Sequence, residues 1–248
     1  MSAPTLAGVL WDMDGTLIDS EPLWLDAEHE MLGRYGIEMG AETNEQLIGS
    51  GLWEAAEHFR ALGVPLSADD IVAEWVRHVG AGMDRDGLIW RPGARELLAD
   101  LADHGIPCAL VTMSVRALAD RMVAQLPAGT FRAVIAGDEV AHEKPHPDPY
   151  LRGAAALGVD PEACLAFEDS PTGVRSAVSA GSVTIGVTNL LDLGATPAHE
   201  VWPTLSGITA DALGEHFVRL SSALPRERSP QRVRPALRSA AVSLDLPA

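Results

Sequence analysis

The sequence predicts an α/β fold: a doubly wound parallel sheet with a small α-helical domain inserted after the first strand. Apolar runs of strand length recur along the 248 residues, at 7–11, 107–111, 131–136, 163–167 and 183–187. Between the later runs, apolar residues follow helical spacing, for example from Ala94 to Leu101. Continuous apolar strands that alternate with helices are typical of a parallel sheet covered on both faces.

The inserted helical domain is predicted at residues 20–85. This stretch offers only helical signals, at 21–35 after a Ser20 cap, at 44–62 and at 67–79, separated by glycines and a proline. Residues 1–19 and 86–221 then form the α/β core domain. Residues 222–248 combine prolines and serines with five arginines, so we expect a flexible tail, with binding of an anionic partner as the less favoured alternative.

The overall charge and the cysteines limit the class of protein. A formal net charge of −17 argues against a nucleic-acid-binding protein, because affinity for phosphate backbones comes largely from Lys and Arg. The N-terminal residues lack the basic region of a signal peptide, and no apolar stretch reaches the ~18 residues that span a bilayer. Cys108 and Cys164 each lie in an apolar run, which favours buried reduced thiols over a disulfide. We therefore expect a cytoplasmic protein without a membrane partner; the oligomeric state stays open.

The segment DMDGTL at 12–17 directly follows the first apolar run. Asp12 and Asp14 are spaced by two, which places both on one side of an extended chain. In a doubly wound sheet the ligand crevice lies at the carboxyl ends of the strands, so we expect this pair at the crevice floor. Two close carboxylates repel each other, and a divalent cation relieves that repulsion. Asp and Gly are also common in turns, so this segment alone leaves a purely structural role open.

Three further polar segments, each at the end of a predicted strand, favour a functional site. They are VTMS at 111–114, EKP at 143–145 and FEDS at 167–170. These segments would bring to the crevice two hydroxyls at a helix start, one ammonium and an acidic pair, from Thr112, Ser114, Lys144, Glu168 and Asp169. Capping a helix and binding an anion use the same free amides, so both roles of the hydroxyl segment are compatible.

The region around residue 144 allows a second interpretation. His142 and His146 formally match the zinc-peptidase pattern H-E-x-x-H. That pattern requires both histidines on one face of a helix, and Pro145 does not fit inside a helix, so we do not expect a zinc site. Pro145, Pro147 and Pro149 are instead expected to hold the segment extended and stiff.

In this order, the four polar segments resemble the motifs of the haloacid dehalogenase superfamily of aspartate-nucleophile phosphatases and phosphomutases. DMDGTL at 12–17 is similar to the first motif, Thr112 to the second, KPHPD at 144–148 to the third and EDSPTG at 168–173 to the fourth. The resemblance covers about residues 7–190 and implies a Rossmann-like core with a helical cap domain, as in the β-phosphoglucomutase and hexose-phosphate phosphatase subfamily. Glu143 departs from the pattern, which often has glycine there, and its charge could weaken phosphate capture by Lys144.

The resemblance also implies a reaction and a cofactor. Asp12 would attack phosphorus to give an aspartyl-phosphate, while Asp14 would protonate the leaving oxygen and later activate water. Mg²⁺ would be held by the Asp12 side chain, the Asp14 backbone carbonyl and Asp169, with Glu168 in or near the coordination shell.

The remaining site residues are implied as ligands of the substrate. Phosphoryl oxygens, over which charge spreads in the transition state, would be bound by Thr112, Ser114, the Met113 amide and Lys144. Contacts to the rest of the substrate are expected from the cap domain, at Glu21, Trp24 and Gly49.

The cap favours a phosphatase over a mutase. Residues 44–52 resemble the β-phosphoglucomutase cap loop, but Ile48 and Leu52 stand where that enzyme has lysine and arginine, and Trp24 stands where it has histidine. The run DSEPLW at 19–24 resembles the hexose-phosphate phosphatase branch. We therefore expect Mg²⁺-dependent hydrolysis of small phosphomonoesters, sugar phosphates in particular. A β-phosphoglucomutase-type phosphomutase is the first alternative, and a catalytically silent phospho-ligand binding module is the second.

Overall fold

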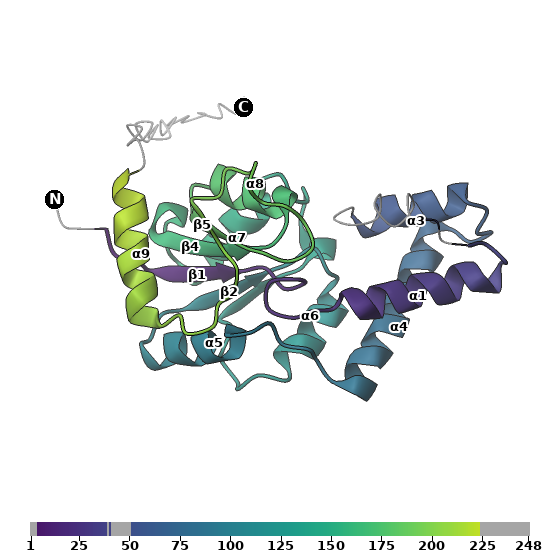
Figure 1. Cartoon of the computed structure of the whole chain (residues 1–248), viewed down its shortest axis with the longest axis horizontal. Helices are drawn as coiled ribbons and strands as arrows, with labels where there is room; N and C mark the ends of the chain where they lie inside the picture. Colours follow the sequence, from purple (N-terminus) through teal and green to yellow (C-terminus); the bar gives the residue numbers. More distant parts are fainter. Residues whose placement is uncertain (1–3, 39, 41–50, 224–248) are drawn as a thin grey trace, which may run out of the picture.

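The computed structural model describes residues 4–38, 40 and 51–223, and contains a six-stranded sheet in the order β3-β2-β1-β4-β5-β6 (Figure 1). All neighbouring strands are parallel. Their bounds are β1 Gly8–Trp11, β2 Cys108–Val111, β3 Ala133–Ile135, β4 Cys164–Glu168, β5 Val183–Val187 and β6 Glu200–Trp202. The predicted α/β class with a doubly wound, Rossmann-like sheet is confirmed. The strand order reverses at β1, which is where such sheets bind ligands.

Helices cover both faces of the sheet because successive residues of a strand point to opposite sides. Val9 and Trp11 of β1 belong to a core with α5 (Ala94–Asp103), α6 (Arg116–Val123) and α9 (Ala210–Ala223). Leu10 belongs to a second core on the other face, with α7 (Asp148–Leu157) and α8 (Pro171–Ser179). Two short 3₁₀ helices, η1 at Gly137–Glu139 and η2 at Pro161–Ala163, precede α7 and β4.

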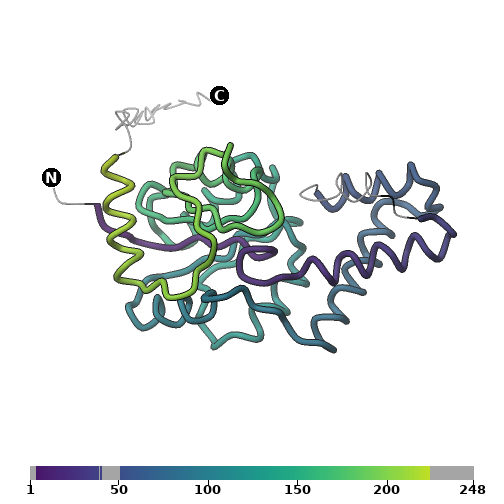
Figure 2. The backbone as a smooth tube through the Cα atoms, in the orientation of Figure 1, coloured from purple at the N-terminus to yellow at the C-terminus, as the bar shows by residue number. Residues whose placement is uncertain are grey.

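Three helices from the predicted insert lie beside the sheet: α1 (Glu21–Arg34), α3 (Leu52–Ala61) and α4 (Ala68–Asp86). They pack on one another, with Phe59 of α3 edge-on to Trp75 of α4 at 4.7 Å between ring centroids. Figure 2 shows the chain leaving the core through α1 and returning through α4. The domain boundaries at 19/20, 85/86 and 221/222 stay predictions.

Helix α4 is longer than the sequence predicted. We expected an end at residue 79, because Gly80 was interpreted as a break, but the helix continues to Asp86. A Cβ at Gly80 would lie 3.0 Å from Arg121, and one at Gly82 would lie 2.6 Å from Leu23. These glycines therefore allow close packing of α4 against α6 and α1. The first part of the predicted helix 44–62, residues 44–50, lies outside the described residues.

Strand β6 and helix α9 were not predicted. β6 is a three-residue edge strand without a continuous apolar run, so it carries little sequence signal. Helix α9 does carry one, since its buried residues Ala210, Leu213, Phe217 and Leu220 follow helical spacing. The helix extends to Ala223, so the first two residues of the predicted tail 222–248 are helical, and 224–248 lie outside the described residues.

The two cysteines have the state that the sequence predicted. Cys108 and Cys164 are both free and buried, as predicted, and burial raises the pKa of each thiol to about 12.

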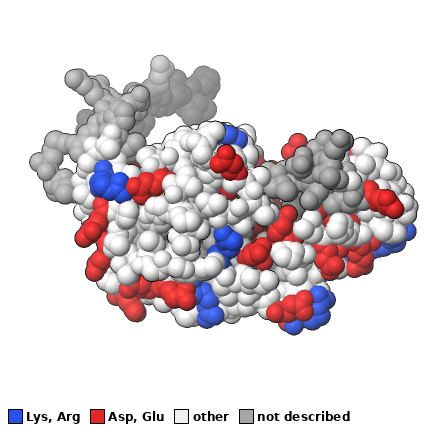
Figure 3. Space-filling model, viewed as in Figure 1, with Lys and Arg blue, Asp and Glu red and all other residues white. Residues whose placement is uncertain are grey.

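Acidic side chains lie over both the core and the inserted helices on the face in Figure 3. Among the helices in the described part of the chain, none has the length and apolar character needed to cross a bilayer.

Candidate active site

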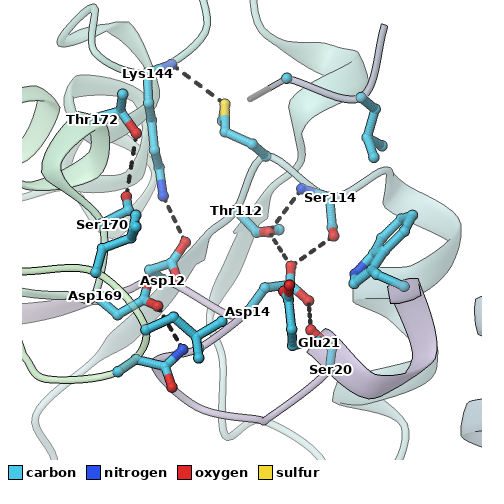
Figure 4. Close-up of a pocket in the computed structure, with 18 of the residues that line it drawn as sticks. Asp12, Asp14, Ser20, Glu21, Thr112, Ser114, Lys144, Asp169, Ser170 and Thr172 are labelled. Atoms are coloured by element: carbon cyan, nitrogen blue, oxygen red, sulfur yellow. Dashed lines mark hydrogen bonds and ion pairs between the residues drawn. The ribbon is translucent and has the colours of Figure 1, made fainter. Parts of the chain in front are cut away.

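A cavity of about 230 Å³ lies where the carboxyl ends of the strands meet the inserted helices. Figure 4 shows the polar side chains converging there from separate segments of the chain. The core contributes these predicted site residues: Asp12, Asp14, Thr112, Met113, Ser114, Lys144 and Asp169. Helix α1 contributes Glu21 and Trp24, whereas Gly49 lies outside the described residues. The cavity therefore occupies the expected position at the point where the strand order reverses.

Asp12 directly follows β1, and its backbone N–H donates to the carbonyl of Phe167 at 3.1 Å. One carboxylate oxygen, Oδ1, accepts a hydrogen bond from Lys144 Nζ at 2.7 Å. The other, Oδ2, is buried without a hydrogen-bond partner among the residues that the structure describes. Burial raises the pKa of Asp12 well above its usual range, Glu168 and Asp169 raise it further, and Lys144 opposes them. Asp12 thus presents one oxygen that no neighbouring donor occupies.

Lys144 is a fixed positive charge at the floor of the cavity. Its side chain is 4% exposed, and its ammonium donates to Asp12 Oδ1, to Glu168 Oε1 at 2.6 Å and to the Val111 carbonyl at 2.9 Å. An ammonium has three protons, so all are used. Burial alone would lower the pKa of Lys144, but the Asp12 and Glu168 carboxylates outweigh it and hold the pKa above its ordinary value.

The segment that carries Lys144 is not extended, so the expectation from its prolines was wrong. The chain turns here: the His146 amide donates to the Glu143 carbonyl at 2.9 Å. Pro147 has helical backbone angles and precedes α7, and Pro149 lies in the first turn of that helix. Proline fits a first turn because the amide there has no helical partner. His142 and His146 lie outside any helix, with their rings 4.4 Å apart between centroids.

Glu168, at the end of β4, is fully buried and held at both carboxylate oxygens. Oε1 accepts from Lys144 and from the Tyr150 hydroxyl at 2.7 Å. Oε2 accepts from the Ser170 hydroxyl at 3.1 Å and from the Ser170 amide at 3.3 Å. Tyr150 was not predicted as part of this region, because nothing in its position within an apolar helix indicated a polar partner. Glu168 therefore anchors Lys144.

Asp169 completes a group of acidic ligands. One oxygen each from Asp12, Glu168 and Asp169 lies within 4.8 Å of the others. Asp169 also accepts a hydrogen bond from Asn189 Nδ2 at 3.0 Å. Burial raises the pKa of Asp169 to about 7, and the Glu168 charge contributes. Carboxylate oxygens suit Mg²⁺, and three of them converge here, so these residues fit that ion.

Asp14 is positioned by hydroxyl groups from two segments. Ser20 Oγ donates to Oδ1, while Ser114 Oγ donates to Oδ2 at 2.7 Å and Thr112 Oγ1 approaches Oδ2 at 3.4 Å. The expected cap was therefore wrong: the Ser20 side chain does not cap α1. Likewise Thr112 and Ser114 do not cap α6, whose N-cap residue is Val115. These three hydroxyl groups orient Asp14 instead, a role that only the tertiary contacts reveal.

Two glycines allow the site loops to approach one another. Gly15 has φ of +83°, and a Cβ there would lie 1.9 Å from Asp169 Oδ2. A Cβ at Gly137 would lie 2.2 Å from the Met113 carbonyl oxygen, so Gly137 lets η1 pack against the loop after β2. In that loop, Met113 Sδ accepts from the Lys144 amide at 3.4 Å.

The insert side of the cavity contains residues that were not predicted as site residues. Glu28 of α1 and Trp75 of α4 line it, together with Glu143. A Cβ at Gly51 would lie 2.9 Å from Glu143 Oε2, so this carboxylate reaches toward the start of α3. The expected neighbour of this carboxylate, Lys144, forms its ion pairs with Asp12 and Glu168 instead. A helical spacing of three and four residues from Glu21 through Trp24 to Glu28 could have indicated the shared face.

Replacing Gly173 with alanine should destabilise the protein and disturb the site. A Cβ there would lie 1.8 Å from Glu168 Oε1, and that carboxylate is held by several hydrogen bonds. Overpacking of this kind costs about 1–3 kcal/mol of unfolding free energy. Gly214 of α9 has nothing within 4 Å of the same position, so Gly214→Ala is the matched control and should stabilise slightly. Urea denaturation measures both; equal effects would contradict the packing argument.

Comparison with known proteins identifies the family. A family model described as haloacid dehalogenase-like hydrolase matches residues 6–181. The chain belongs to the haloacid dehalogenase-like hydrolases, and the resemblance seen in its four motifs is confirmed. The expectation that the protein is an enzyme is confirmed with it.

Individual relatives include several phosphatases. Hexitol phosphatase A of Escherichia coli (strain K12) is 37% identical over 184 residues, covering 73% of this chain and 82% of that protein. Fructose-1-phosphate phosphatase YqaB of the same organism is 34% identical over 185 residues, covering 73% and 96%. The structure of CbbY from Rhodobacter sphaeroides in complex with phosphate has a TM-score of 0.75 at 27% identity, covering 84% of this chain and 99% of that one. These relatives support the assignment to phosphoric monoester hydrolases.

Proposed function

We propose that this hydrolase is a Mg²⁺-dependent phosphatase that hydrolyses small phosphomonoesters, sugar phosphates in particular, through an aspartyl-phosphate. The observation that carries the proposal is the Asp12 carboxylate. One of its oxygens accepts a hydrogen bond from Lys144. The other is buried and has no hydrogen-bond partner among the residues that the structure describes. A carboxylate held in this way is suited to attack an electrophile that enters the cavity. The phosphatases among its relatives support phosphorus as that electrophile.

Asp14 is the general acid and base of this mechanism. The hydroxyls of Ser20 and Ser114 fix both of its oxygens, so its carboxyl group has one orientation in the cavity. Asp14 protonates the leaving oxygen when Asp12 bonds to phosphorus, and it then removes a proton from the water that hydrolyses the aspartyl-phosphate. Lys144, whose three ammonium protons are donated to Asp12, Glu168 and the Val111 carbonyl, supplies positive charge beside the phosphoryl group, and the loop at 112–114 binds the remaining phosphoryl oxygens.

Asp12, Asp169 and the Asp14 backbone carbonyl are the proposed Mg²⁺ ligands, with Glu168 next to them as the partner of Lys144. When bound, Mg²⁺ would neutralise phosphoryl charge and lower the repulsion among these carboxylates. A small phosphorylated metabolite is the proposed partner. The location in the reducing cytoplasm stays a prediction, consistent with the two free thiols.

Release of inorganic phosphate from a panel of metabolites, with Mg²⁺ or with a chelator, tests the proposal. We expect turnover with Mg²⁺ and none after chelation. Rapid interconversion of β-glucose 1-phosphate and glucose 6-phosphate without phosphate release would favour the mutase instead. Binding of phosphorylated ligands without any turnover would favour the silent binding module.

The metal-free protein should lose stability as the pH rises from about 4 to about 7. In this window the folded state keeps the proton of Asp169, whose pKa is about 7, while the unfolded state has released it. The folded state then binds more protons, so its stability falls with increasing pH. Mg²⁺ binds the ionised form and should therefore stabilise the protein more at pH 8 than at pH 5.

Thermal denaturation at both pH values, with Mg²⁺ or with a chelator, measures this difference. Asp169→Asn removes the titrating group and should remove most of the Mg²⁺ effect. Equal stabilisation by Mg²⁺ at pH 5 and pH 8 in the unaltered protein would show that Asp169 is not a ligand.

A further inference from the structure

Glu28 is a buried carboxylate at the insert end of the cavity. Its residue exposure is 9%, and it lies on α1 with Glu21 and Trp24, which also line the cavity. In the part of the chain that the structure describes, no side chain or backbone group donates a hydrogen bond to it. Burial raises the pKa of Glu28 to about 7, and the charge of Glu21 adds to that effect. Because Glu28 lines the cavity and has no donor of its own among the described residues, its carboxylate can accept hydrogen bonds from a ligand.

Asp26 and Glu30, the two acidic residues on the exposed face of α1, differ from Glu28 in having partners. Asp26 and Glu30 both pair with His78, and Glu30 also lies 3.6 Å from Arg34. Their side chains are 65% and 59% exposed. The surface face of the helix thus has its charges paired, while the face toward the cavity does not.

A second polar group without a partner lines the same end of the cavity. Trp75 is 1% exposed, and its indole N–H is buried without an acceptor among the described residues. Glu28 can only accept hydrogen bonds when ionised, whereas an indole N–H can only donate. A hydroxyl group both donates and accepts, so a ligand with several hydroxyls can donate to Glu28 while it lies against Trp75.

The charge at this end of the cavity excludes a second anionic group. Among the lining residues that the structure describes, Lys144 is the only Lys or Arg, and it is paired with Asp12 and Glu168 at the opposite end. Residues 39–50, which precede α3 in sequence, contain neither Lys nor Arg. A second phosphate or a carboxylate near Glu21 and Glu28 would therefore meet like charge without a cation.

Glu28 also lies far from the reacting groups. A short ester bound at those groups does not reach it. Ser20, which donates a hydrogen bond to Asp14, directly precedes α1, so Glu21 marks the catalytic end of this helix. Glu28 lies seven residues further along this helix, which corresponds to roughly 10 Å along the axis. A leaving group of several carbons is needed to approach both.

We infer that Glu28 determines substrate specificity: it accepts hydrogen bonds from the hydroxyl groups of a polyol or sugar monophosphate, and it rejects esters whose leaving group carries a second phosphate or a carboxylate. This inference rests on the proposed phosphatase activity. Glu28 takes no part in the chemical step, so its effect depends on the leaving group and disappears for a substrate that has no hydroxyls.

Three substrates separate these effects: fructose 1-phosphate, fructose 1,6-bisphosphate and p-nitrophenyl phosphate. The unaltered enzyme should prefer fructose 1-phosphate over the bisphosphate by roughly 10-fold or more in kcat/KM. Glu28→Leu removes the acceptor and should lower kcat/KM for fructose 1-phosphate roughly 10- to 100-fold, the range of a hydrogen bond to a charged group. Its activity on p-nitrophenyl phosphate should stay within about 3-fold, because that leaving group lacks hydroxyls.

Glu28→Gln keeps an acceptor and removes the charge. Two quantities should therefore change by different factors. The ratio of kcat/KM for the monophosphate to kcat/KM for the bisphosphate should fall by more than kcat/KM for the monophosphate itself. Glu30→Gln, on the exposed face of the same helix, is the matched control and should change neither. Circular dichroism of each variant confirms that α1 remains folded.

Two results would overturn the inference while leaving the phosphatase proposal intact. One is equal loss on all three substrates in Glu28→Leu, which would mean a structural role. The other is hydrolysis of the bisphosphate by the unaltered enzyme as efficient as that of the monophosphate. Absence of phosphate release from all three substrates, p-nitrophenyl phosphate included, would instead contradict the proposed function itself.

Discussion

Asp12→Asn should reduce phosphate release by roughly a thousandfold or more, because the amide cannot form the aspartyl-phosphate. The fold should not suffer. Asp12 is one of three carboxylates grouped around Lys144, and burial together with Glu168 and Asp169 raises its pKa. Removing one negative charge from this group lowers their mutual repulsion, while the Asn oxygen can still accept from Lys144. We therefore expect a melting temperature equal to or higher than that of the unaltered protein in metal-free buffer.

Steady-state phosphate release and differential scanning calorimetry measure the two effects. Asp103→Asn, an exposed acidic residue at the end of α5, is the control with the same chemical change and should alter neither quantity. Activity that survives in Asp12→Asn would exclude Asp12 as the nucleophile. A large loss of stability would show that this carboxylate mainly serves the fold.

Lys144→Met should affect both activity and stability. It leaves the carboxylates of Asp12 and Glu168 buried without their shared cation, and removing one member of a buried charge pair costs about 3–5 kcal/mol. Phosphate release should fall roughly a hundredfold or more, because the positive charge that lies beside the phosphoryl group is lost. The loss of stability should be smaller at lower pH, where the Asp12 carboxyl, whose pKa is raised, takes up a proton.

A double-mutant cycle separates the pairing of Lys144 from its packing. Asp12→Asn added to Lys144→Met removes a charge that lacks its partner, so the double variant should recover part of the stability that Lys144→Met loses. Urea denaturation of the four proteins at pH 7.5 measures the coupling. Purely additive effects would mean that the Lys144–Asp12 pair, at 2.7 Å in the structure, contributes no interaction free energy.

The core sheet could be predicted because its strands are buried on both faces. Four-to-five-residue strands such as β1, β4 and β5 consist almost wholly of apolar residues, and each ends in or before a polar segment. β6 escaped prediction because an edge strand with partly exposed residues has no such pattern. The end of α4 was misplaced because a glycine inside a helix looks the same in sequence whether it breaks the helix or packs against a neighbour.

In the site, the sequence identified the chemical groups but not their partners. The spacing of Asp12 and Asp14 and the polar segments at strand ends located the cavity. Ser20, however, was interpreted as a helix cap, and only the three-dimensional structure shows that it donates to Asp14. The Tyr150 hydroxyl on Glu168 also links residues 18 apart in sequence, across two elements.

The sequence by itself determined the class of fold and the polar groups available at the proposed site, because local apolar patterns fix strand positions and residue types fix the available chemical groups. The tertiary structure decided which atoms remain without partners. Asp12 Oδ2 and Glu28 differ from the other carboxylates of this acidic chain through their burial, and burial depends on how α1, the sheet ends and the loops pack together. A side chain's solvation and its neighbours' charges set its reactivity, and neither is encoded in the residue's own position along the chain.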